Sequence, residues 1–236
     1  MTSTHATRCR ITRVTRLGFV NAYLVEEDDG LTLVDTMLSG SAEGILAAAG
    51  GLERPIVRVV LTHAHSDHAG SLDALAARLP GVEIAVSARE ARLLAGDHGL
   101  DAGEPDSKLR GGWPQVETRP TRLLEHGDRV GSLRVVAAPG HTPGHIALLD
   151  ERDATLIAGD AFSTLGGVST TGRINRRFPL PGMATWDRPT ANRTAAMLRT
   201  LDPAALAVGH GPVIADPAAA IDHALAVVGA DLRMAA

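Results

Sequence analysis

Apolar residues along this chain are concentrated in short β-branched runs that alternate with Ala- and Leu-rich stretches. Residues 19–25 and 31–34 are two such runs separated by a charged turn, which predicts a β-hairpin. The almost continuous apolar run at 56–61 is typical of a buried strand. Further strands are predicted at 82–86, 122–124, 133–137, 145–149, 155–158 and 205–208, and helices at 41–49, 71–79, 88–95, 189–201 and 217–228. Strands that alternate with helices in this way indicate a layered α/β fold.

Two stretches, 96–120 and 163–186, are rich in Gly and Pro and have no clear periodicity. Long irregular stretches in a regular domain are usually functional, and we expect these two to form the walls of a substrate pocket. The chain shows no internal repeat, low-complexity tract or interdomain linker. We therefore expect residues 1–236 to form a single domain, in which two packed sheets carry helices on their outer faces.

Composition and charge narrow the classes of partner. Only 3% of the residues are aromatic, which nearly excludes stacking platforms for single-stranded nucleic acid, and a net charge of -4 gives no overall attraction to a phosphate backbone. Cys9 is the only cysteine, so no intrachain disulfide can form. No stretch resembles a signal peptide or a membrane span. We expect a cytoplasmic protein that acts on a small molecule and binds neither nucleic acid nor membrane.

Directly after the predicted strand at 56–61 comes Thr-His-Ala-His-Ser-Asp-His-Ala-Gly at 62–70, which contains His63, His65, Asp67 and His68. Imidazole nitrogens and carboxylate oxygens are the ligands that suit zinc and similar first-row divalent ions. A solvated polar turn is the alternative interpretation, but side chains of the same types follow three further predicted strands. These side chains are His141, Asp160 and His210. We therefore expect a metal site where these strands end.

The series His-x-His-x-Asp-His, followed by separate His, Asp and His residues, resembles the metallo-β-lactamase superfamily over nearly the whole chain. The resemblance implies a four-layered αββα sandwich with two metal ions at one edge of the paired sheets. It also implies the ligands of each ion: His63, His65 and His141 for the first, Asp67, His68 and His210 for the second, and Asp160 as a bridge between them. Asp35 resembles the buried aspartate of this family that supports the metal-binding loop through hydrogen bonds.

The ligand set distinguishes between branches of this family. Secreted β-lactamases commonly have a Cys in the second site or an Asn in place of the first His, whereas the only cysteine here is Cys9, so antibiotic hydrolysis is a minor option. The segment Gly-His-Thr-Pro-Gly-His at 140–145 resembles the branch of hydroxyacylglutathione hydrolases and lactonases. The chain ends at Ala236, too soon after His210 for the helical substrate-binding domain typical of hydroxyacylglutathione hydrolases. This departure argues against a glutathione thioester as the substrate.

Two divalent ions in such a site, expected to be zinc with iron or manganese as alternatives, can share a water whose pKa falls to about 7. The resulting bridging hydroxide would attack the substrate while the ions polarise the carbonyl and stabilise the leaving group, so no Ser or Cys nucleophile is needed. Asp67 is the expected catalytic residue, because a carboxylate beside the water can orient it or accept its proton. We therefore expect a dinuclear hydrolase of a small ester, thioester or lactone.

Three other functions could use the same residues. A phosphodiesterase or nuclease needs a positive track for neighbouring phosphates, which a net charge of -4 and the lack of an added basic module do not provide. A mononuclear iron oxygenase of the same fold needs only His, His and Asp around one iron, whereas Asp67, His68 and His210 complete a second set. A non-enzymatic binding protein would not need an intact ligand set at every position.

The remaining histidines have simpler interpretations. His145 begins a predicted apolar strand and is expected to be a hydrogen-bonded structural residue. The other four are expected at the surface, although His98 falls in the long loop that could cover the site; they are His5, His98, His126 and His223. Three arginines that follow Asp160 either attract an anionic substrate or form a solvated basic loop, and the solvated loop is the favoured interpretation. They are Arg173, Arg176 and Arg177.

Overall fold

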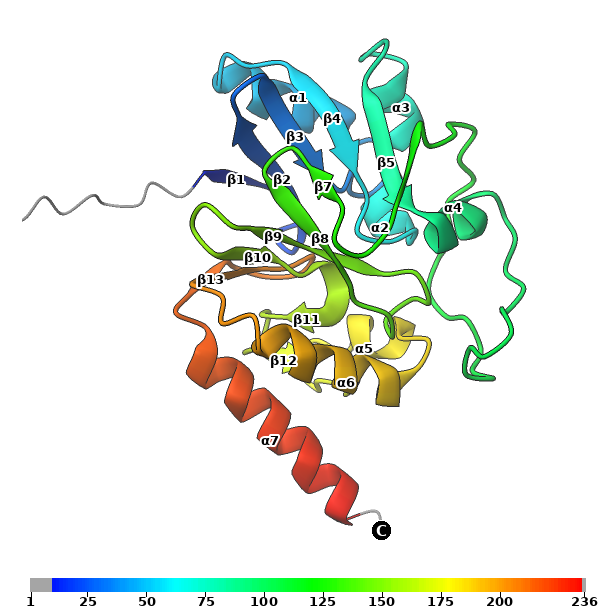
Figure 1. The fold of residues 1–236 in the computed structure, drawn as a ribbon, viewed down its shortest axis with the longest axis vertical. Helices are drawn as coiled ribbons and strands as arrows, with labels where there is room; N and C mark the ends of the chain where they lie inside the picture. The colour runs from blue at the N-terminus through cyan, green and yellow to red at the C-terminus, as the bar shows by residue number, and fades with distance from the viewer. Residues whose placement is uncertain (1–9, 235–236) are drawn as a thin grey trace, which may run out of the picture.

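The computed structural model describes residues 10–234, so His5 and Cys9 lie outside the described residues. Two six-stranded sheets face each other, and helices cover the outer face of each sheet (Figure 1). The chain therefore has the four-layered αββα arrangement that was expected from the resemblance. That residues 1–236 form a single domain stays a prediction.

The first sheet is built from the N-terminal half of the chain and is mixed. Its strands are, in spatial order, β1 (Ile11–Arg16), β2 (Val20–Glu27), β3 (Gly30–Val34), β4 (Ile56–Val60), β5 (Glu83–Ser87) and β6 (Arg122–Leu124). The first three strands pair antiparallel, and β3 to β6 pair parallel. Parallel strands need crossover connections, which here contain the helices α1 (Ala42–Gly51), α3 (Leu72–Ala76) and α4 (Ala88–Leu94).

The second sheet is built from the C-terminal half of the chain. Its strands are, in spatial order, β14 (Ile214–Ala215), β13 (Ala205–Ala207), β10 (Thr155–Ile157), β9 (Ile146–Asp150), β8 (Leu133–Ala137) and β7 (Arg129–Val130). Strands β10 and β13 pair parallel, and the crossover between them contains helix α6 (Arg188–Arg199). Helix α7 (Ala218–Met234) packs beside α6 and against β12 (Ser169–Thr170), which forms a small hairpin with β11 (Phe162–Ser163).

Three hydrophobic clusters separate the four layers, because alternate residues of a strand face opposite sides of its sheet. In β2, Leu24 belongs to the cluster shared with α1, α3 and α4, whereas Tyr23 and Val25 belong to the cluster between the two sheets. In β9, Leu148 packs between the sheets and Leu149 packs in the cluster shared with α6 and α7. The alternation of apolar residues in the longer strands therefore sets the order of the layers.

The hydrophobic pattern predicts most of the helices and strands but misses several strands. It predicts no element at β1, β7 or β14. It also predicts irregular structure throughout 163–186, which is wrong, because this stretch contains β11, β12 and α5 (Leu180–Ala184). The helix predicted at 71–79 is shorter, since α3 ends at Ala76, and the closing helix continues to Met234. Strands of two residues contain too few positions for a period to be visible.

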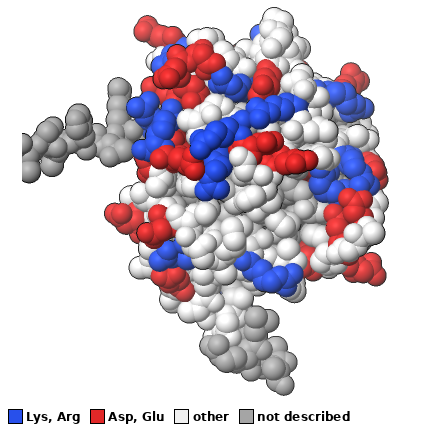
Figure 2. All heavy atoms as spheres, viewed as in Figure 1, with Lys and Arg blue, Asp and Glu red and all other residues white. Residues whose placement is uncertain are grey.

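The long loop agrees with the sequence pattern. Residues 95–121 contain no helix or strand, which confirms the irregular stretch predicted at 96–120. No helix within the described part of the chain has both the length and the apolar character needed to cross a membrane. On the face shown in Figure 2, basic and acidic side chains lie intermingled.

Candidate metal centre

Four loops at the ends of strands β4, β8, β10 and β13 bring together all seven residues that the sequence motifs single out. In chain order they are His63 and His65 between β4 and α2 (Ser66–Ala69), Asp67 and His68 within α2, His141 after β8, Asp160 in the 3₁₀ turn η1 (Gly159–Ala161) after β10, and His210 after β13. These residues are far apart in the sequence, and the packing of the two sheets makes them neighbours.

Within residues 10–234, three groups of three side chains have the spacing of a metal site, and the one formed by His63, His68 and Asp160 spans the other two. The three-histidine group is His63, His65 and His141, and the mixed group is Asp67, His68 and His210. Within each group, one potential ligand atom of each residue lies within 4.8 Å of those of the other two. The histidines are buried, whereas the side chain of Asp67 is 34% exposed. Asp67 is therefore the member of the two groups that solvent reaches most easily.

The carboxylate of Asp160 lies between the two groups. Its Oδ2 is 3.5 Å from Nε2 of His141 in the three-histidine group and 3.2 Å from Nε2 of His210 in the mixed group. Its Oδ1 is 3.5 Å from Nε2 of His68. Asp160 therefore occupies the position from which one carboxylate can serve both groups.

Three buried polar atoms of this cluster have no hydrogen-bond partner among residues 10–234. They are Nε2 of His63, Nε2 of His68 and Oδ1 of Asp160. An unpaired buried polar group costs about 1–3 kcal/mol, so such groups usually have another partner. Gly209 keeps the space beside them open, because a Cβ there would lie 2.2 Å from Oδ1 of Asp160. The donor atoms and the space around them therefore fit divalent cations.

The ring orientation in the mixed group is set by hydrogen bonds on the outer nitrogens. Nδ1 of His68 donates to Oδ2 of Asp35 at 2.8 Å, and Nδ1 of His210 donates to the carbonyl oxygen of Phe19 at 3.2 Å. Because a ring that donates from Nδ1 directs Nε2 inward, both rings present Nε2 to Asp160. Phe19 contributes only its backbone to this contact, so no residue type in the sequence signals the role.

Two rings of the three-histidine group are oriented by atoms from the stretches 96–120 and 163–186. The carbonyl oxygen of Arg110 accepts from Nε2 of His65 at 2.8 Å, which leaves Nδ1 of this ring to face Nε2 of His141 at 3.0 Å. The hydroxyl of Thr185 donates to backbone carbonyls, so it accepts from Nδ1 of His141 at 3.0 Å. His65 therefore presents Nδ1 to the centre, whereas His141 presents Nε2.

Asp35 connects the end of β3 to the metal-binding loop. Its carboxylate accepts hydrogen bonds from the backbone N–H and the hydroxyl of Thr62 at 2.7 and 2.8 Å, in addition to the bond from His68. Asp35 has a positive φ of 63°, a conformation that Asp tolerates better than most residues with a side chain. These contacts agree with the supporting role expected of Asp35.

The two groups differ in how they bind protons. Burial holds the pKa of His63 and of His141 well below the usual range, so both rings are neutral and keep a lone pair. Burial also acts to lower the pKa of His68 and His210, but nearby carboxylates together outweigh it: Asp160, Asp35 and Asp67 raise the pKa of His68 to about 9, and Asp160 and Asp67 raise that of His210 to about 10. Without a metal ion, both histidines of the mixed group are therefore protonated at pH 7.

A cavity of about 320 Å³ opens onto the centre. Residues of both groups and Asp160 form part of its lining, together with Phe19. The other walls come from the stretches 96–120 and 163–186, as the sequence predicts. The residues are Gly111, Gly112, Leu180, Pro181, Met183 and Ala184, the last four of which lie in α5. None of the residues that line this cavity is a Lys or an Arg.

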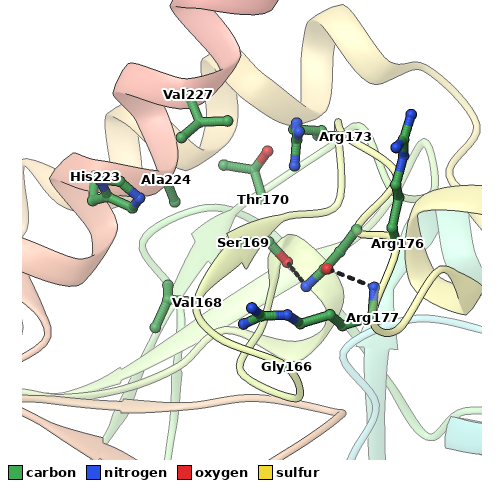
Figure 3. Close-up of a pocket in the computed structure, with 11 residues that line it drawn as sticks. Gly166, Val168, Ser169, Thr170, Arg173, Arg176, Arg177, His223, Ala224 and Val227 are labelled. Carbon is green, nitrogen blue, oxygen red and sulfur yellow. Dashed lines mark hydrogen bonds between the residues drawn. The ribbon is translucent and has the colours of Figure 1, made fainter.

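The three arginines that follow Asp160 in the sequence do not line this cavity. Arg173, Arg176 and Arg177 line a separate cavity of about 260 Å³, which lies between the loop at 166–177 and helix α7 (Figure 3). Arg176 and Arg177 are exposed, in agreement with a solvated basic loop. Their placement gives no support to the alternative that they attract a substrate to the metal centre.

The remaining described histidines lie outside the two groups. His145 is buried, and its Nε2 accepts a hydrogen bond from the backbone N–H of Asp160 at 3.0 Å, which agrees with the expected structural role. His126 and His223 are exposed, as expected. His98 is also exposed, and it lines another cavity rather than the one at the metal centre.

Comparison with known proteins identifies the family. The sequence profile of the metallo-beta-lactamase superfamily matches residues 15–210, a range that includes every residue of the centre. The chain belongs to the metallo-beta-lactamase superfamily. The family and the fold implied by the histidine motifs are thereby confirmed, and the chain is a metal-dependent hydrolase.

Three relatives illustrate the range of similarity within the metallo-beta-lactamase superfamily. YobT of Bacillus subtilis (strain 168), an uncharacterized protein, is 44% identical over 87% of this chain and 89% of its own length. A hydroxyacylglutathione hydrolase of Stenotrophomonas maltophilia (strain R551-3) is 30% identical over 66% of this chain and 52% of its own length. The crystal structure of TTHA1623 in a di-iron-bound form has a TM-score of 0.65 and 26% identity, over 88% of this chain and 95% of that chain.

A metal ion that enters the mixed group must displace the protons of His68 and His210, because only a neutral ring binds a metal. We expect Zn²⁺ binding at pH 7 to release at least about two protons per chain. The apparent affinity should rise with pH and level off above about 10, where the raised pKa values of both rings have been passed. Calorimetric titration of metal-free protein in buffers of different ionisation enthalpy measures the number of protons released on Zn²⁺ binding. Release of less than about one proton per chain would contradict the protonation of His68 and His210 described above.

Proposed function

We propose that the chain hydrolyses an uncharged small ester, thioester or lactone, with two divalent metal ions held by the three-histidine group, the mixed group and Asp160. The observation that carries this proposal is the position of Asp160, whose carboxylate lies within 3.5 Å of ring nitrogens from both groups. A carboxylate in such a position can be shared by two ions and offsets part of their charge. We propose zinc as the resident metal, with iron or manganese as alternatives; the di-iron-bound form of TTHA1623 supports iron.

When bound, the two ions would activate a water and polarise the carbonyl group of the substrate. Asp67 is the proposed catalytic residue, because it lines the cavity and is the most exposed member of the two groups. Burial opposes the charge on Asp67, but His68 and His210 outweigh this effect and hold the pKa of Asp67 below its usual range. Its Oδ2 lies 3.2 Å from Nε2 of His210, so its other oxygen is left to orient the attacking water or to accept a proton.

The walls of the cavity favour a substrate with an apolar, uncharged portion. Leu180 and Met183 of α5 line the cavity and are each 55% exposed, and Phe19 adds an aromatic surface. Because the lining contains no Lys or Arg, a phosphate or carboxylate remote from the reacting bond would find no cationic side chain there. The relative named hydroxyacylglutathione hydrolase supports cleavage of an acyl bond.

Phosphodiester hydrolysis by the same centre receives less support. A nucleic acid would need cationic side chains beside the centre for its neighbouring phosphates. The three arginines that follow Asp160 in the sequence line another cavity, and no Lys or Arg lines the cavity at the centre. A one-iron oxygenase would leave the mixed group without a role. We therefore propose a small-molecule substrate and no nucleic-acid partner.

Asp160→Asn is expected to remove the shared ligand of both ions and most of the activity. The wild-type protein, loaded with Zn²⁺ and freed of excess, should hold about two ions per chain, and the variant about one or fewer. Hydrolysis of p-nitrophenyl hexanoate should fall by at least about 100-fold. Elemental analysis and a spectrophotometric assay measure both quantities.

The matched control is Asp150→Asn, which changes another buried aspartate that is paired with Arg152 in the second sheet. This variant should keep about two ions and at least about half of the wild-type activity when folded. Retention of two ions and full activity by Asp160→Asn, or loss of metal from Asp150→Asn alone, would show that the proposed bridge is misplaced.

The rates at which the protein cleaves carbonyl and phosphodiester substrates distinguish the proposed function from the phosphodiesterase alternative. We expect kcat/KM for p-nitrophenyl hexanoate or a γ-lactone to exceed that for bis-p-nitrophenyl phosphate by at least about tenfold, a difference of about 1.4 kcal/mol in transition-state stabilisation. The apolar walls and the lack of cationic side chains in the cavity are the physical reasons. Equal or faster cleavage of the phosphodiester, weakening steeply with salt, would favour the alternative.

A further inference from the structure

Glu90 is a buried carboxylate that the proposed reaction does not use. It lies in the first turn of α4 with no exposed surface, and side chains of this type are rarely buried without partners. Its Oε1 accepts hydrogen bonds from the hydroxyl of Thr142 at 2.6 Å and from the backbone N–H of Gly144 at 2.8 Å. Its Oε2 accepts one from the backbone N–H of Ala64 at 2.8 Å. Both carboxylate oxygens are therefore used.

The three donors belong to the two loops that carry the three-histidine group. Ala64 lies between His63 and His65, and Thr142 directly follows His141. The loop after β4 follows a strand of the first sheet and the loop after β8 follows a strand of the second. Besides the bonds to Glu90, the backbone N–H of Ile146 donates to the carbonyl oxygen of Thr62 at 3.0 Å and joins the two sheets near this point. A single carboxylate therefore connects the two loops at the point where the three rings meet.

The helix that carries Glu90 is itself held against the second loop. The hydroxyl of Ser87, the N-cap of α4, accepts from the backbone N–H of Glu90 at 3.2 Å and donates to the carbonyl oxygen of Gly144 at 2.7 Å. A Cβ at position 144 would lie 2.6 Å from Cβ of Arg89 and 2.8 Å from the backbone nitrogen of Glu90. This close approach fixes the carboxylate relative to the loop after β8.

The mixed group depends on other anchors. His68 is held by Asp35 and His210 by the carbonyl oxygen of Phe19, as described above. None of the hydrogen-bond partners of Glu90 within the described part of the chain is next to these residues in the sequence. A change at position 90 is therefore expected to act unequally on the two groups.

Resting on the proposed function, we propose that Glu90 is a positioning residue that sets the spacing of the three-histidine group and thereby the affinity of this group for its metal ion. The carboxylate acts only through Ala64, Thr142 and Gly144 and does not touch the ion. Changes in residues that orient metal ligands typically lower metal affinity by about 10–100-fold, and displacements of about 0.5 Å are enough to weaken a site.

Glu90→Gln tests this proposal, because the amide has the shape of the carboxylate but only one accepting oxygen, so at least one of the three donors loses its acceptor. In competition titrations of metal-free protein with Zn²⁺ and a chromophoric chelator, we expect one of the two affinities to fall by about 10–100-fold and the other to change by less than about threefold. Repeating the titration in a His210→Ala background assigns the weakened site, since only the three-histidine group is intact there. The same loss must appear in that background.

Glu27→Gln is the matched control. Glu27 is also a buried carboxylate, at the far end of β2 from Phe19, and it accepts hydrogen bonds from the backbone N–H and the hydroxyl of Ser132. Loss of its charge should affect stability without changing either Zn²⁺ affinity by more than about threefold. An equal loss of affinity in Glu27→Gln and Glu90→Gln would mean that the effect is general destabilisation, and the proposal would be overturned.

Thr142→Val and Thr142→Ser keep the proposal testable if Glu90→Gln does not fold. The valine removes one donor to the carboxylate and should weaken the same site by at least about threefold, whereas the serine keeps the hydroxyl and should restore the wild-type affinity. Wild-type affinities in Thr142→Val, or in a folded Glu90→Gln, would overturn the proposal. The proposed function fails separately, if the wild-type protein itself binds fewer than two Zn²⁺ ions or hydrolyses no carbonyl substrate.

Discussion

Each histidine of the metal centre has two ring nitrogens, Nδ1 and Nε2, and either could face the centre. The hydrogen bond made by one nitrogen leaves the other to face the centre. The partners that make these hydrogen bonds are Asp35, the hydroxyls of Thr62 and Thr185, and the carbonyl oxygens of Phe19 and Arg110. They come from both halves of the chain and from both irregular stretches. The ring nitrogens that would bind the metal ions therefore face the centre only when the layers are assembled. We expect folding and metal binding to stabilise each other for this reason.

Polar contacts between the layers place the ligand loops, while the three apolar clusters supply most of the burial. The hydroxyl of Tyr23 in β2 donates to the carbonyl oxygen of Val208 at 2.7 Å and accepts from its N–H at 3.0 Å, and Asn21 donates to the same carbonyl oxygen and to that of Gly211. Burial raises the pKa of Tyr23, so its hydroxyl keeps the proton. The first sheet thus positions the His210 loop of the second, and Glu90 connects the loops of the three-histidine group in a similar way.

The residues of the centre can be predicted from the sequence because they occur as local motifs at the ends of strands whose apolar character is visible. The atoms that orient these residues cannot be predicted from the sequence, since Phe19 and Arg110 contribute backbone carbonyls that no residue type reveals. Glu90 has the ordinary appearance of a residue in the first turn of a helix, and only the packing of α4 buries it. The strand β1 was missed because Thr and Arg interrupt its two apolar positions, Ile11 and Val14. Nearness in sequence also misleads, because the arginines after Asp160 line another cavity, which residues of α7 also line.

We propose that the carboxylate of Asp160 joins two metal ions whose histidine ligands are selected by their outer hydrogen bonds. A crystal structure of the zinc-loaded protein, with anomalous diffraction at the zinc absorption edge, tests this claim most directly. We expect two zinc peaks roughly 3.5–4 Å apart, both in contact with Asp160, with His65 bound through Nδ1 and the other histidines of the two groups through Nε2. A single peak, two peaks that do not share Asp160, or a His65 ring bound through Nε2 would contradict the claim.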